Sequence, residues 1–455
     1  MPISYGNAVR LIEIEADTQS PNFQNGMETV QLDRALNRTC GRTYSSPDST
    51  PRFDTSAMDG YALSSEATKN VSVECPAMFS VRGTIAAGDE PLQVSGEPDS
   101  KGVYPCVEIM TGARFPDSSA GMPFDCCVRH EDTTAAMNGG PSDSRHISIT
   151  KAAKYQQNRR FAGGDFNEGD GIIQRGSTIQ TRHIMALASV GHREISVYRK
   201  PRVAIYSTGA ELDVRNLKDL NCHKIRDVNG PYCSATLESW GAEADFLGLL
   251  GDDAVEIGGT IGSHLDGCKY DLIITTGAVS AGKFDLVRAG IERVGASVLF
   301  HKVSMRPGHP ALFASIRNPS EESSRIPFFG LPGNPVASAA CLRFMVHPYL
   351  RRLQSQKPER PLKADVRGTD KTSNSNNHRK AAQGEVISSL PPDKDVFRLG
   401  IYGKSVHNQK LEVKLIEDHS PGKIKPFLWA NCWIHIPASK VELRNGDMVD
   451  IFPIS

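Results

Sequence analysis

Three loops in the middle of the chain place carboxylates beside small residues. STGAEL carries Glu211, LLGDD carries Asp252, and TTGAVSAGKFD ends on Asp285. Each loop follows an apolar or β-branched run that predicts a buried strand. Ligands of open α/β sheets bind at the carboxyl ends of the strands, so the loops are expected at one ligand-binding edge. Carboxylates hold Mg²⁺, and the cation bridges phosphate oxygens; the pattern therefore predicts a metal-assisted phosphate site.

Each of these three acids has another explanation when it is considered alone. Any one of them is equally explained as a helix N-cap or first-turn residue that complements the helix dipole. Glu211 is also a candidate general base. The small residues beside the acids are easier to interpret, because glycine permits close backbone approach and exposed amides at a helix start favour an anion. Thr276 and Gly277 are therefore candidate phosphate-binding residues.

A basic loop follows these strands. HKVSMRPGHP, residues 301–310, contains Lys302, Arg306 and His309 within a short span that is bent by Pro307-Gly308. The simplest interpretation is a solvated positive loop. Because the loop belongs to the same α/β region as the small-residue turns, we favour an anion pocket.

Two further turns carry charged residues. SAMDGYA places Asp59 between a proline-containing connector and a region of short strands. NRRFAGGDF places Arg160 and Asp165 on either side of a Gly-Gly turn. Each turn alone is typical of an ordinary Asx-capped turn.

Alternating strands and helices must position these loops. From Pro201 to Arg352 strand-like runs alternate with helical ones, which predicts parallel βαβ units and a doubly wound sheet. The N-terminal region predicts helices over 7–14 and 30–36. Short runs that begin at Val71–Val73 predict a β-rich module from about 60 to 155. The alternation in the last part of the chain predicts a small β-barrel or β-sandwich.

Composition excludes several classes of protein. The chain has 455 residues, 39% hydrophobic and 23% charged, which is typical of a globular protein with several domains. Lys+Arg and Asp+Glu balance at 52 each, which argues against a general nucleic-acid binder. No apolar run is long enough to span a membrane. The cysteines are scattered without CxxC pairs, so free thiols and a cytoplasmic location are expected.

The motifs together resemble the MoeA family, which includes the gephyrin E domain and the plant and fungal molybdenum insertases. The resemblance runs from about residue 5 to the C-terminus and follows the family's motif order: SAMDGYA, IMTGA, RRFAGGD, YRKPRVAIYSTGAEL, TTGAVSAGKFD, MRPGHP and LPGNPVAS.

The resemblance implies a four-part subunit that forms a homodimer. Residues 1–50 with 151–196 would form an N-terminal linker domain of small α/β type, and 51–150 an inserted β-rich domain. Residues 197–352 would form a doubly wound domain that resembles the molybdopterin-binding fold. Residues 353–455 would form a C-terminal β-barrel domain.

The resemblance also implies a reaction. Family members insert molybdate into adenylylated molybdopterin with Mg²⁺ and release AMP. Molybdopterin, its adenylate and molybdate would therefore be substrates. Because the sequence carries no domain of the kind that makes the adenylate, we expect an adenylyltransferase partner protein.

The family's functional positions map onto this chain one by one. Asp59, Glu211, Asp252 and Asp285 match acids of the family site, with Asp59 contributed across the dimer. The positions that match substrate-binding residues are Thr111, Arg160, Asp165, Ser280, Lys302 and Pro310, and Arg379 resembles an arginine placed near molybdate.

Several site positions depart from the family pattern. Ala210 and Lys283 stand where the family has acids, Ala278 replaces a glycine, and Arg306 and His309 replace lysines. Fewer carboxylates should weaken Mg²⁺ binding, whereas added positive charge favours an anion. The family's serine-rich run before Ala430 is also missing.

Three hypotheses follow from these departures. The chain is a working insertase, a repurposed enzyme that acts on another anionic or adenylated metabolite, or a non-catalytic scaffold. Because the acids Asp59, Glu211, Asp252 and Asp285 are all retained, we favour an enzyme, and among enzymes the insertase.

Overall fold

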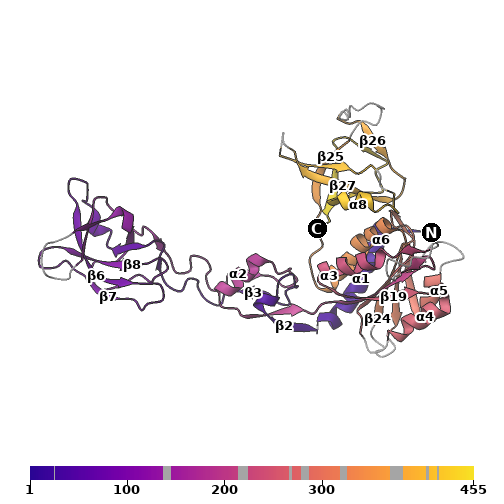
Figure 1. Ribbon diagram of the computed structural model, residues 1–455, viewed down its shortest axis with the longest axis horizontal. Coiled ribbons are helices and arrows are strands. Elements are labelled where there is room, and N and C mark those ends of the chain that lie inside the picture. The colour runs from indigo at the N-terminus through magenta and orange to yellow at the C-terminus, as the bar shows by residue number, and fades with distance from the viewer. Residues whose placement is uncertain are drawn as a thin grey trace. The chain divides into compact units, whose positions relative to one another are not determined.

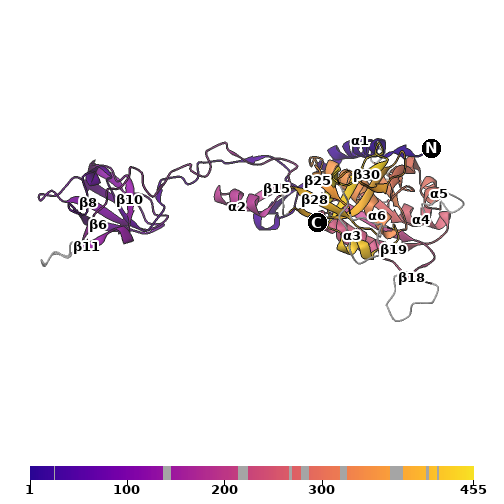
Figure 2. The same ribbon diagram turned by 90° about the horizontal axis from the view of Figure 1, so that it is seen from above.

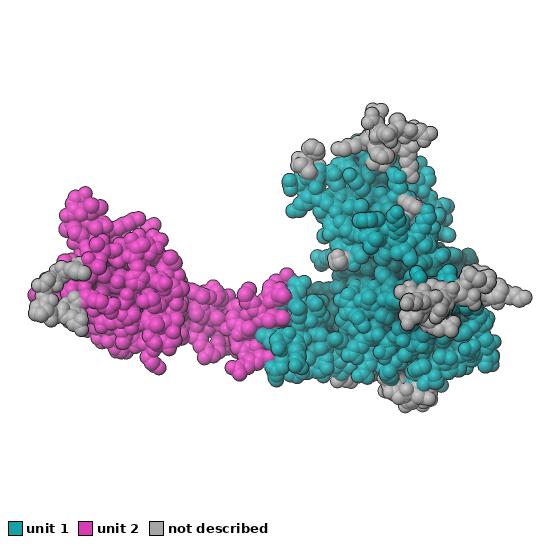
Figure 3. Space-filling view, in the orientation of Figure 1, with its two compact units in different colours: residues 1–42, 175–180, 194–455 teal, residues 43–174, 181–193 magenta. Residues whose placement is uncertain are grey.

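A computed structural model describes residues 1–24, 26–136, 145–213, 224–265, 269–277, 286–317, 325–368, 383–405, 409–417 and 420–454. The chain divides into two compact units (Figure 3). The larger unit comprises residues 1–42, 175–180 and 194–455, and the smaller comprises 43–174 and 181–193. Within the described residues, no helix has the length and apolar character that a membrane crossing requires.

The larger unit contains a 6-stranded sheet with the strand order β19-β16-β20-β24-β23-β21. The pairings among β19, β16, β20 and β24 are parallel, and β23 and β21 add antiparallel strands at one edge. The strand bounds are β16 Arg202–Thr208, β19 Glu243–Leu250, β20 Leu272–Thr276, β21 Ala296–His301, β23 Leu312–Arg317 and β24 Arg325–Leu331.

Helices cover both faces of this sheet. Val203 and Ile205 of β16 pack into one core with α1, α3, α6 and α7, whereas the intervening Ala204 and Tyr206 pack into a second core with α4 and α5. Figure 1 shows α1, α3 and α6 grouped apart from α4 and α5. Alternate residues of a strand point to opposite faces, so an almost continuous apolar run becomes a strand buried on both sides. The doubly wound α/β prediction is confirmed. The helix bounds are α1 Tyr5–Gln24, α3 Asn229–Ser239, α4 Ala254–Ser263, α5 Leu286–Arg293, α6 Pro335–Cys341 and α7 His347–Leu353, with a π-helical turn over Leu342–Val346. Figure 2 shows α1 running along the surface of the unit from the N-terminus.

The C-terminal strands form a closed barrel. Their order is β27-β28-β25-β31-β29, and β29 pairs back with β27. Closure leaves no unpaired edge in the ring, so the prediction of a C-terminal β-barrel is confirmed. Two strands from outside the barrel, β22 and β1, extend its sheet beside β27. The bounds are β1 Ile3–Ser4, β22 Val303–Arg306, β25 Leu362–Arg367, β27 Asp395–Lys404, β28 Leu411–Leu415, β29 Cys432–Ile436 and β31 Met448–Pro453.

Shorter elements complete the larger unit. They are the strand pairs β2 Met27–Gln31 with β15 Glu194–Tyr198, β17 Leu212–Asp213 with β18 Ile225–Arg226, and β26 Val386–Ser389 with β30 Glu442–Arg444, together with α8 Lys425–Trp429.

The smaller unit is built around a 6-stranded sheet with the order β10-β5-β8-β6-β12-β11. Apolar side chains fill both faces, with Ile85 and Val107 in one core and Phe79 and Cys106 in the other. The predicted β-rich module is confirmed. The bounds of this sheet are β5 Gly60–Leu63, β6 Ala77–Ile85, β8 Tyr104–Ile109, β10 Cys126–Arg129, β11 Thr134–Ala136 and β12 His146–Ile149. The other elements of the unit include β3 Tyr44–Ser45, β4 Thr55–Ser56, β7 Gln93–Gly96, β9 Asp117–Gly121, β13 Arg159–Arg160, β14 Gly171–Ile173 and α2 Thr181–Ser189.

Two local predictions are wrong. Residues 30–36 form the end of β2 and a 3₁₀ turn over Leu32–Arg34, because β2 pairs with the distant β15. Residues 71–73 form no strand, since their backbone is not part of any ladder. The division into four domains stays a prediction.

Candidate functional site

A cavity of ≈ 830 Å³ opens at the carboxyl ends of β16, β20 and β24. We call it the acidic cavity. It brings together five residues predicted from the sequence to act in the site: Glu211, Asp252, Thr276, Gly277 and Pro310. The remaining lining residues include Thr208, Gly209, Asp227, Asn229, Gly333 and Asn334. The ligand-binding edge predicted from the strand pattern is therefore hollow.

Close approach of the strand ends shapes the floor of this cavity. Gly277 has φ +91, and a Cβ there would lie 2.4 Å from the Thr208 carbonyl oxygen. Its N–H donates to the Leu331 carbonyl oxygen at 2.9 Å, which fixes the end of β20 against the end of β24. Only glycine meets both demands, because a side chain is strained at positive φ and has no space here.

The two predicted acids of the cavity are held differently. Asp252 Oδ2 accepts the N–H of Ala210 at 2.9 Å, which fixes its carboxylate over the loop after β16. The exposed Glu211 carboxylate accepts no hydrogen bond from another described residue. Among the described acids of the cavity, Glu211 is therefore the candidate to take a proton or to bind a ligand.

A third acid of the cavity, Asp227, was missed by the sequence analysis. Its Oδ2 accepts the Ser207 hydroxyl at 2.6 Å, and its Oδ1 accepts the N–H groups of Asn229 and Gly230 at 3.0 and 3.2 Å. Asn229 Nδ2 in turn donates to the Gly333 carbonyl oxygen at 2.8 Å. An Asp just before a predicted helix start was the available signal, since such residues cap helices.

The acids also decide what kind of metal site fits. Among the described residues, no group of three or more His, Cys, Asp or Glu side chains is placed to hold a metal. Mg²⁺ commonly takes one or two carboxylates and completes its shell with water and substrate phosphates. Glu211 and Asp252, which line the same cavity, fit that mode of binding and do not form a closed protein cage.

A second cavity of ≈ 560 Å³ lies between the α/β sheet and the barrel, and its lining includes Arg306 and Arg398. We call it the arginine cavity. β22 pairs with β27 so that Arg306 stands opposite Val396, two residues before Arg398. Arg398 is 9% exposed, and its Nη1 donates to the Ser388 hydroxyl at 2.7 Å. Burial and the neighbouring Arg306 charge lower the pKa of Arg398 to about 10.

Arg398 was also missed by the sequence analysis. The predicted C-terminal arginine, Arg379, lies outside the described residues. A single charged residue in the apolar run VFRLGIY was the available signal, because a charge is buried at such a position only when the fold uses it.

The two cavities adjoin each other. Pro307 and Val336 line the arginine cavity, whereas Pro310 and Pro335 line the acidic cavity. Pro421 lies on the arginine side, and its carbonyl oxygen accepts the N–H of Val336 at 2.9 Å. Short turns of the sheet domain and of the barrel therefore form a shared wall.

Two predicted residues of the basic loop line neither cavity. His309 Nδ1 donates to the Val303 carbonyl oxygen at 2.8 Å, so this ring nitrogen is committed to the turn. Lys302 has φ 73, and its backbone N–H and carbonyl bond Ala311 and Ile3. Of the three basic residues predicted to form an anion pocket, Arg306 lines the arginine cavity.

Four predicted residues belong to the smaller unit. Asp59 Oδ1 accepts the N–H and the hydroxyl of Thr111 at 2.6 and 2.9 Å, and these bonds lower the pKa of Asp59. Arg160 and Asp165 form an exposed ion pair across the Gly-Gly turn. The hydrogen bonds from Thr111 therefore hold the Asp59 carboxylate in place, and the ion pair holds the Gly-Gly turn between Arg160 and Asp165.

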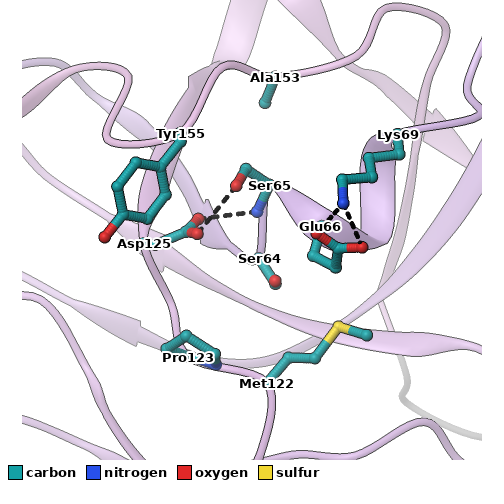
Figure 4. A pocket seen from close by; sticks show the side chains of 9 residues that line it. All are labelled: Ser64, Ser65, Glu66, Lys69, Met122, Pro123, Asp125, Ala153 and Tyr155. Atoms are coloured by element: carbon teal, nitrogen blue, oxygen red, sulfur yellow. Dashed lines mark hydrogen bonds and ion pairs between the residues drawn. The ribbon is translucent and has the colours of Figure 1, made fainter.

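A separate cavity of the smaller unit contains none of the predicted residues. It measures ≈ 470 Å³ and is lined by Ser64, Asp125, Tyr155 and neighbours (Figure 4). Asp125 accepts both the N–H and the hydroxyl of Ser65, at 2.7 and 2.8 Å. The buried Ser64 hydroxyl has no hydrogen-bond partner among the described residues.

Four further predicted residues lie outside the described part of the chain: Ser280, Lys283, Asp285 and Arg379. Ala278, one of the departures from the family pattern, lies outside it as well.

Comparison with known proteins shows which protein family the chain resembles. The MoeA N-terminal region (domain I and II) matches residues 3–191, and a probable molybdopterin binding domain matches residues 204–352. The molybdopterin molybdenumtransferase of Haemophilus influenzae is 30% identical over 437 residues, which cover 95% of either chain. That of Synechococcus elongatus is 30% identical over 356 residues, 78% of this chain and 82% of the relative.

Solved structures agree on the fold. A molybdopterin biosynthesis MoeA protein from Pyrococcus horikoshii OT3 aligns with a TM-score of 0.71 at 21% identity and covers 99% of both chains. The domain matches and the near-complete coverage of a 30% identical relative point to the same group of proteins. The chain belongs to the MoeA family, whose curated relatives here are named molybdopterin molybdenumtransferases.

Proposed function

We propose that this chain is a molybdenum insertase that places molybdate into adenylylated molybdopterin and releases AMP. The observation that carries the proposal is the pair of adjoining cavities, one lined by acids and tight glycine turns and the other by two arginines. The names of the relatives support the same chemistry.

The arginine cavity suits a tetrahedral oxyanion. Arg306 and Arg398 supply positive charge, and Ser388, Ser389 and Ser420 supply hydroxyl donors around them. Charge-assisted hydrogen bonds from guanidinium groups are the strongest that a protein offers an oxyanion. Arg398 is 9% exposed, so water screens its attraction for an anion less than it would at the surface.

The acidic cavity suits the phosphates of the adenylate. Backbone amides near Gly209, Gly277 and Gly333 can approach phosphate oxygens closely, because these positions have no side chain. Mg²⁺ held by Glu211 and Asp252 would neutralise phosphate charge when bound. As the alternative to metal binding, the Glu211 carboxylate would accept the proton of the attacking water, while Asp252 accepts the Ala210 amide.

Residues of the smaller unit have a proposed role as well. Asp59 with Thr111, and Arg160 with Asp165, are the matches to family positions that contact substrate. The account includes a homodimer in which Asp59 serves the site of the other copy. An adenylyltransferase partner protein would supply the adenylate.

Complementation tests the proposal. Cells that lack their own insertase should regain nitrate reductase activity when they express this chain. Glu211→Gln should not restore it, although the variant folds, because the general base is lost. Equal rescue by wild type and Glu211→Gln would show that Glu211 is not the general base. Failure by a folded wild-type protein would overturn the insertase proposal.

Ala210 keeps a second function under consideration. It stands where the resemblance implies an acid, at the loop that carries Glu211, so the cavity has fewer carboxylates for Mg²⁺. A repurposed enzyme would act on another anionic or adenylated metabolite. Insertase activity that appears only in the double variant Ala210→Asp with Lys283→Asp would identify such a diverged enzyme. Activity already present in the wild type would exclude it.

A further inference from the structure

The cavity of the smaller unit that Figure 4 shows has no part in the proposed insertase reaction. We call it the Asp125 cavity. Its volume of ≈ 470 Å³ is within the range of small-molecule sites. The lining contains two carboxylates, those of Glu66 and Asp125, and one ammonium, that of Lys69, which leaves one net negative charge. The charge of the cavity therefore favours a cation.

Hydrogen bonds hold the walls of this cavity together. Thr68 is fully buried, donates its hydroxyl to the Ser65 carbonyl oxygen at 2.7 Å and accepts the N–H of Ala153 at 2.9 Å. These two bonds join the 3₁₀ turn Glu66–Thr68 to the segment that carries Ala153 and Tyr155. Because the wall is already ordered, a ligand loses little affinity to the ordering of the chain around it.

Asp125 is the buried charge of the cavity. It is 7% exposed, and both of its carboxylate oxygens accept hydrogen bonds from Ser65, Oδ1 from the N–H at 2.7 Å and Oδ2 from the hydroxyl at 2.8 Å. Each carboxylate oxygen has a second lone pair. Burial and the Asp125 charge raise the pKa of the Cys126 thiol, so this neighbour stays neutral. Asp125 is therefore a fixed carboxylate that can still accept hydrogen bonds from a ligand.

The cations near Asp125 are paired with other acids. Arg159 donates to the carbonyl oxygen just before Asp125 at 3.3 Å, but its guanidinium forms an ion pair with Asp54 at 2.6 Å. Lys69 pairs with Glu66 at 2.5 Å on the other side of the cavity (Figure 4). In the described part of the chain, Asp125 has no ion pair of its own. Because it is little exposed, water screens its attraction for a cation only weakly.

Aromatic and aliphatic surface accompanies this carboxylate. Tyr155 is 69% exposed and lies on the same side of the cavity as Asp125, and Met122 and Pro123 add apolar surface (Figure 4). A guanidinium is planar, stacks on aromatic rings and donates two parallel hydrogen bonds to a carboxylate, whereas an ammonium is a strongly hydrated point charge. The residues of the lining therefore suit a guanidinium better than an ammonium.

We propose that the Asp125 cavity binds a guanidinium group on an apolar stem, with Asp125 accepting its paired N–H donors and Tyr155 covering its planar face. The stem would lie against Met122 and Pro123. The group belongs either to an arginine of a partner protein or to a free small molecule, and the same contacts serve both. None of these residues takes part in the proposed insertase reaction, so this site stands independently of it.

Ligand-observed NMR with the full-length protein tests the site. The probes are n-butylguanidinium, its neutral planar counterpart n-butylurea, n-butylammonium and N-acetyl-arginine methylamide. Asp125→Asn removes the charge and keeps an oxygen for the N–H of Ser65, and Tyr155→Leu removes a ring from an exposed position. Asp99→Asn is the matched control, because Asp99 also accepts two hydrogen bonds, at 2.8 and 3.0 Å, and lies outside the cavity.

The wild type should bind n-butylguanidinium with a Kd of about 1 mM, and about tenfold more tightly than n-butylurea. Affinity should fall about tenfold in Asp125→Asn and about threefold in Tyr155→Leu, and should stay within about twofold in Asp99→Asn. Lys69→Gln removes the competing cation of the lining, so it should strengthen binding about twofold. Because a folding defect cannot strengthen binding, this variant keeps the test decisive if Asp125→Asn is unstable.

The probes also distinguish the two sources of the group. N-acetyl-arginine methylamide that binds as tightly as n-butylguanidinium assigns the cavity to an arginine within a partner chain, whereas binding of n-butylguanidinium alone assigns it to a free small molecule.

Four results would overturn the proposal. They are equal affinity of the wild type for n-butylguanidinium and n-butylurea, equal affinity for n-butylguanidinium and n-butylammonium, unchanged affinity in Asp125→Asn, and no gain of affinity in Lys69→Gln.

Discussion

Arg398 shows how one residue can link packing to function. Burial and Arg306 both disfavour its charge, and together they lower its pKa to about 10. Arg398 Nη1 already donates to the Ser388 hydroxyl at 2.7 Å. An oxyanion in the arginine cavity would add charge-assisted hydrogen bonds to both guanidinium groups.

Replacing this side chain should weaken oxyanion binding. Arg398→Met keeps most of the apolar stem and removes the charge, so molybdate affinity measured by calorimetry should fall about tenfold or more. Arg367→Met is the control, because Arg367 belongs to the barrel strand β25 and pairs with Glu412 at 2.9 Å, away from the cavity. Equal molybdate affinity in wild type and Arg398→Met would contradict this role.

The same site predicts a pH dependence. The guanidinium of Arg398 loses its proton as the pH rises through about 10, so its attraction for an anion is present below that pH and is lost above it. Molybdate affinity should therefore fall as the pH approaches 10 in the wild type, whereas Arg398→Met should show a shallower fall. Parallel profiles for the two proteins would argue against a titrating Arg398.

Ser64 and Ser65 make a matched pair in the smaller unit. The Ser64 hydroxyl is buried without a described partner, whereas the Ser65 hydroxyl donates to Asp125 at 2.8 Å (Figure 4). Ser64→Ala should stabilise the unit by about 1 kcal/mol, and Ser65→Ala should destabilise it by about 1–2 kcal/mol. Amide hydrogen exchange of β5 and β10 measures both changes in this unit. Destabilisation by Ser64→Ala would show that its hydroxyl is satisfied.

At the scale of elements, the turn after β20 carries the most demanding geometry of the site. Gly277→Ala should place a methyl against the Thr208 carbonyl oxygen and strain a positive φ, so it should lower the free energy of unfolding by more than about 2 kcal/mol and weaken AMP binding. Gly295→Ala is the control, because its φ of +80 is also positive but no atom lies within 4 Å of the added Cβ. It should cost about 1 kcal/mol and leave AMP binding unchanged. Equal effects of the two changes in urea denaturation would refute the close-approach argument.

Some elements could be predicted from the sequence, and others depend on distant pairing. The runs that became β16 and β20 are apolar along their whole length, which is typical of strands buried on both faces. β2 could not be predicted, since METVQ is stabilised by pairing with β15 far along the chain. The local spacing predicts a helix over 30–36, which overlaps the end of β2, and the tertiary pairing overrides it.

Some residues of the candidate site could also be predicted from the sequence, whereas others depend on distant pairing. Glu211, Asp252, Thr276 and Gly277 could be placed together because strand-end loops in an α/β sheet meet at one edge. Arg398 could not be connected with Arg306, because their proximity depends on β22 leaving the α/β sheet region to pair with β27 of the barrel. The role of His309 toward a ligand stays a prediction, and the structure shows that its Nδ1 bonds the Val303 carbonyl oxygen of its own turn.

At the scale of the whole molecule, the larger unit joins two folds into one candidate site. β1 and β22 extend the barrel sheet, and the segment around Pro421 returns from the barrel to the start of α6. The α/β sheet supplies acids and amides, and the barrel supplies Arg398 and Ile424. Neither the α/β sheet nor the barrel alone carries all of these groups, so we expect the reaction to need both domains.

The central claim is most directly tested by reconstitution with purified components. The protein is mixed with adenylylated molybdopterin, Mg²⁺ and molybdate, and cofactor formation is scored by activation of an apo-molybdoenzyme while AMP release is followed. The account predicts AMP release and molybdate-dependent activation in the wild type, little AMP release in Glu211→Gln, and impaired molybdate-dependent activation in Arg398→Met. A folded wild-type protein that gives no molybdate-dependent activation, with or without AMP release, would contradict it.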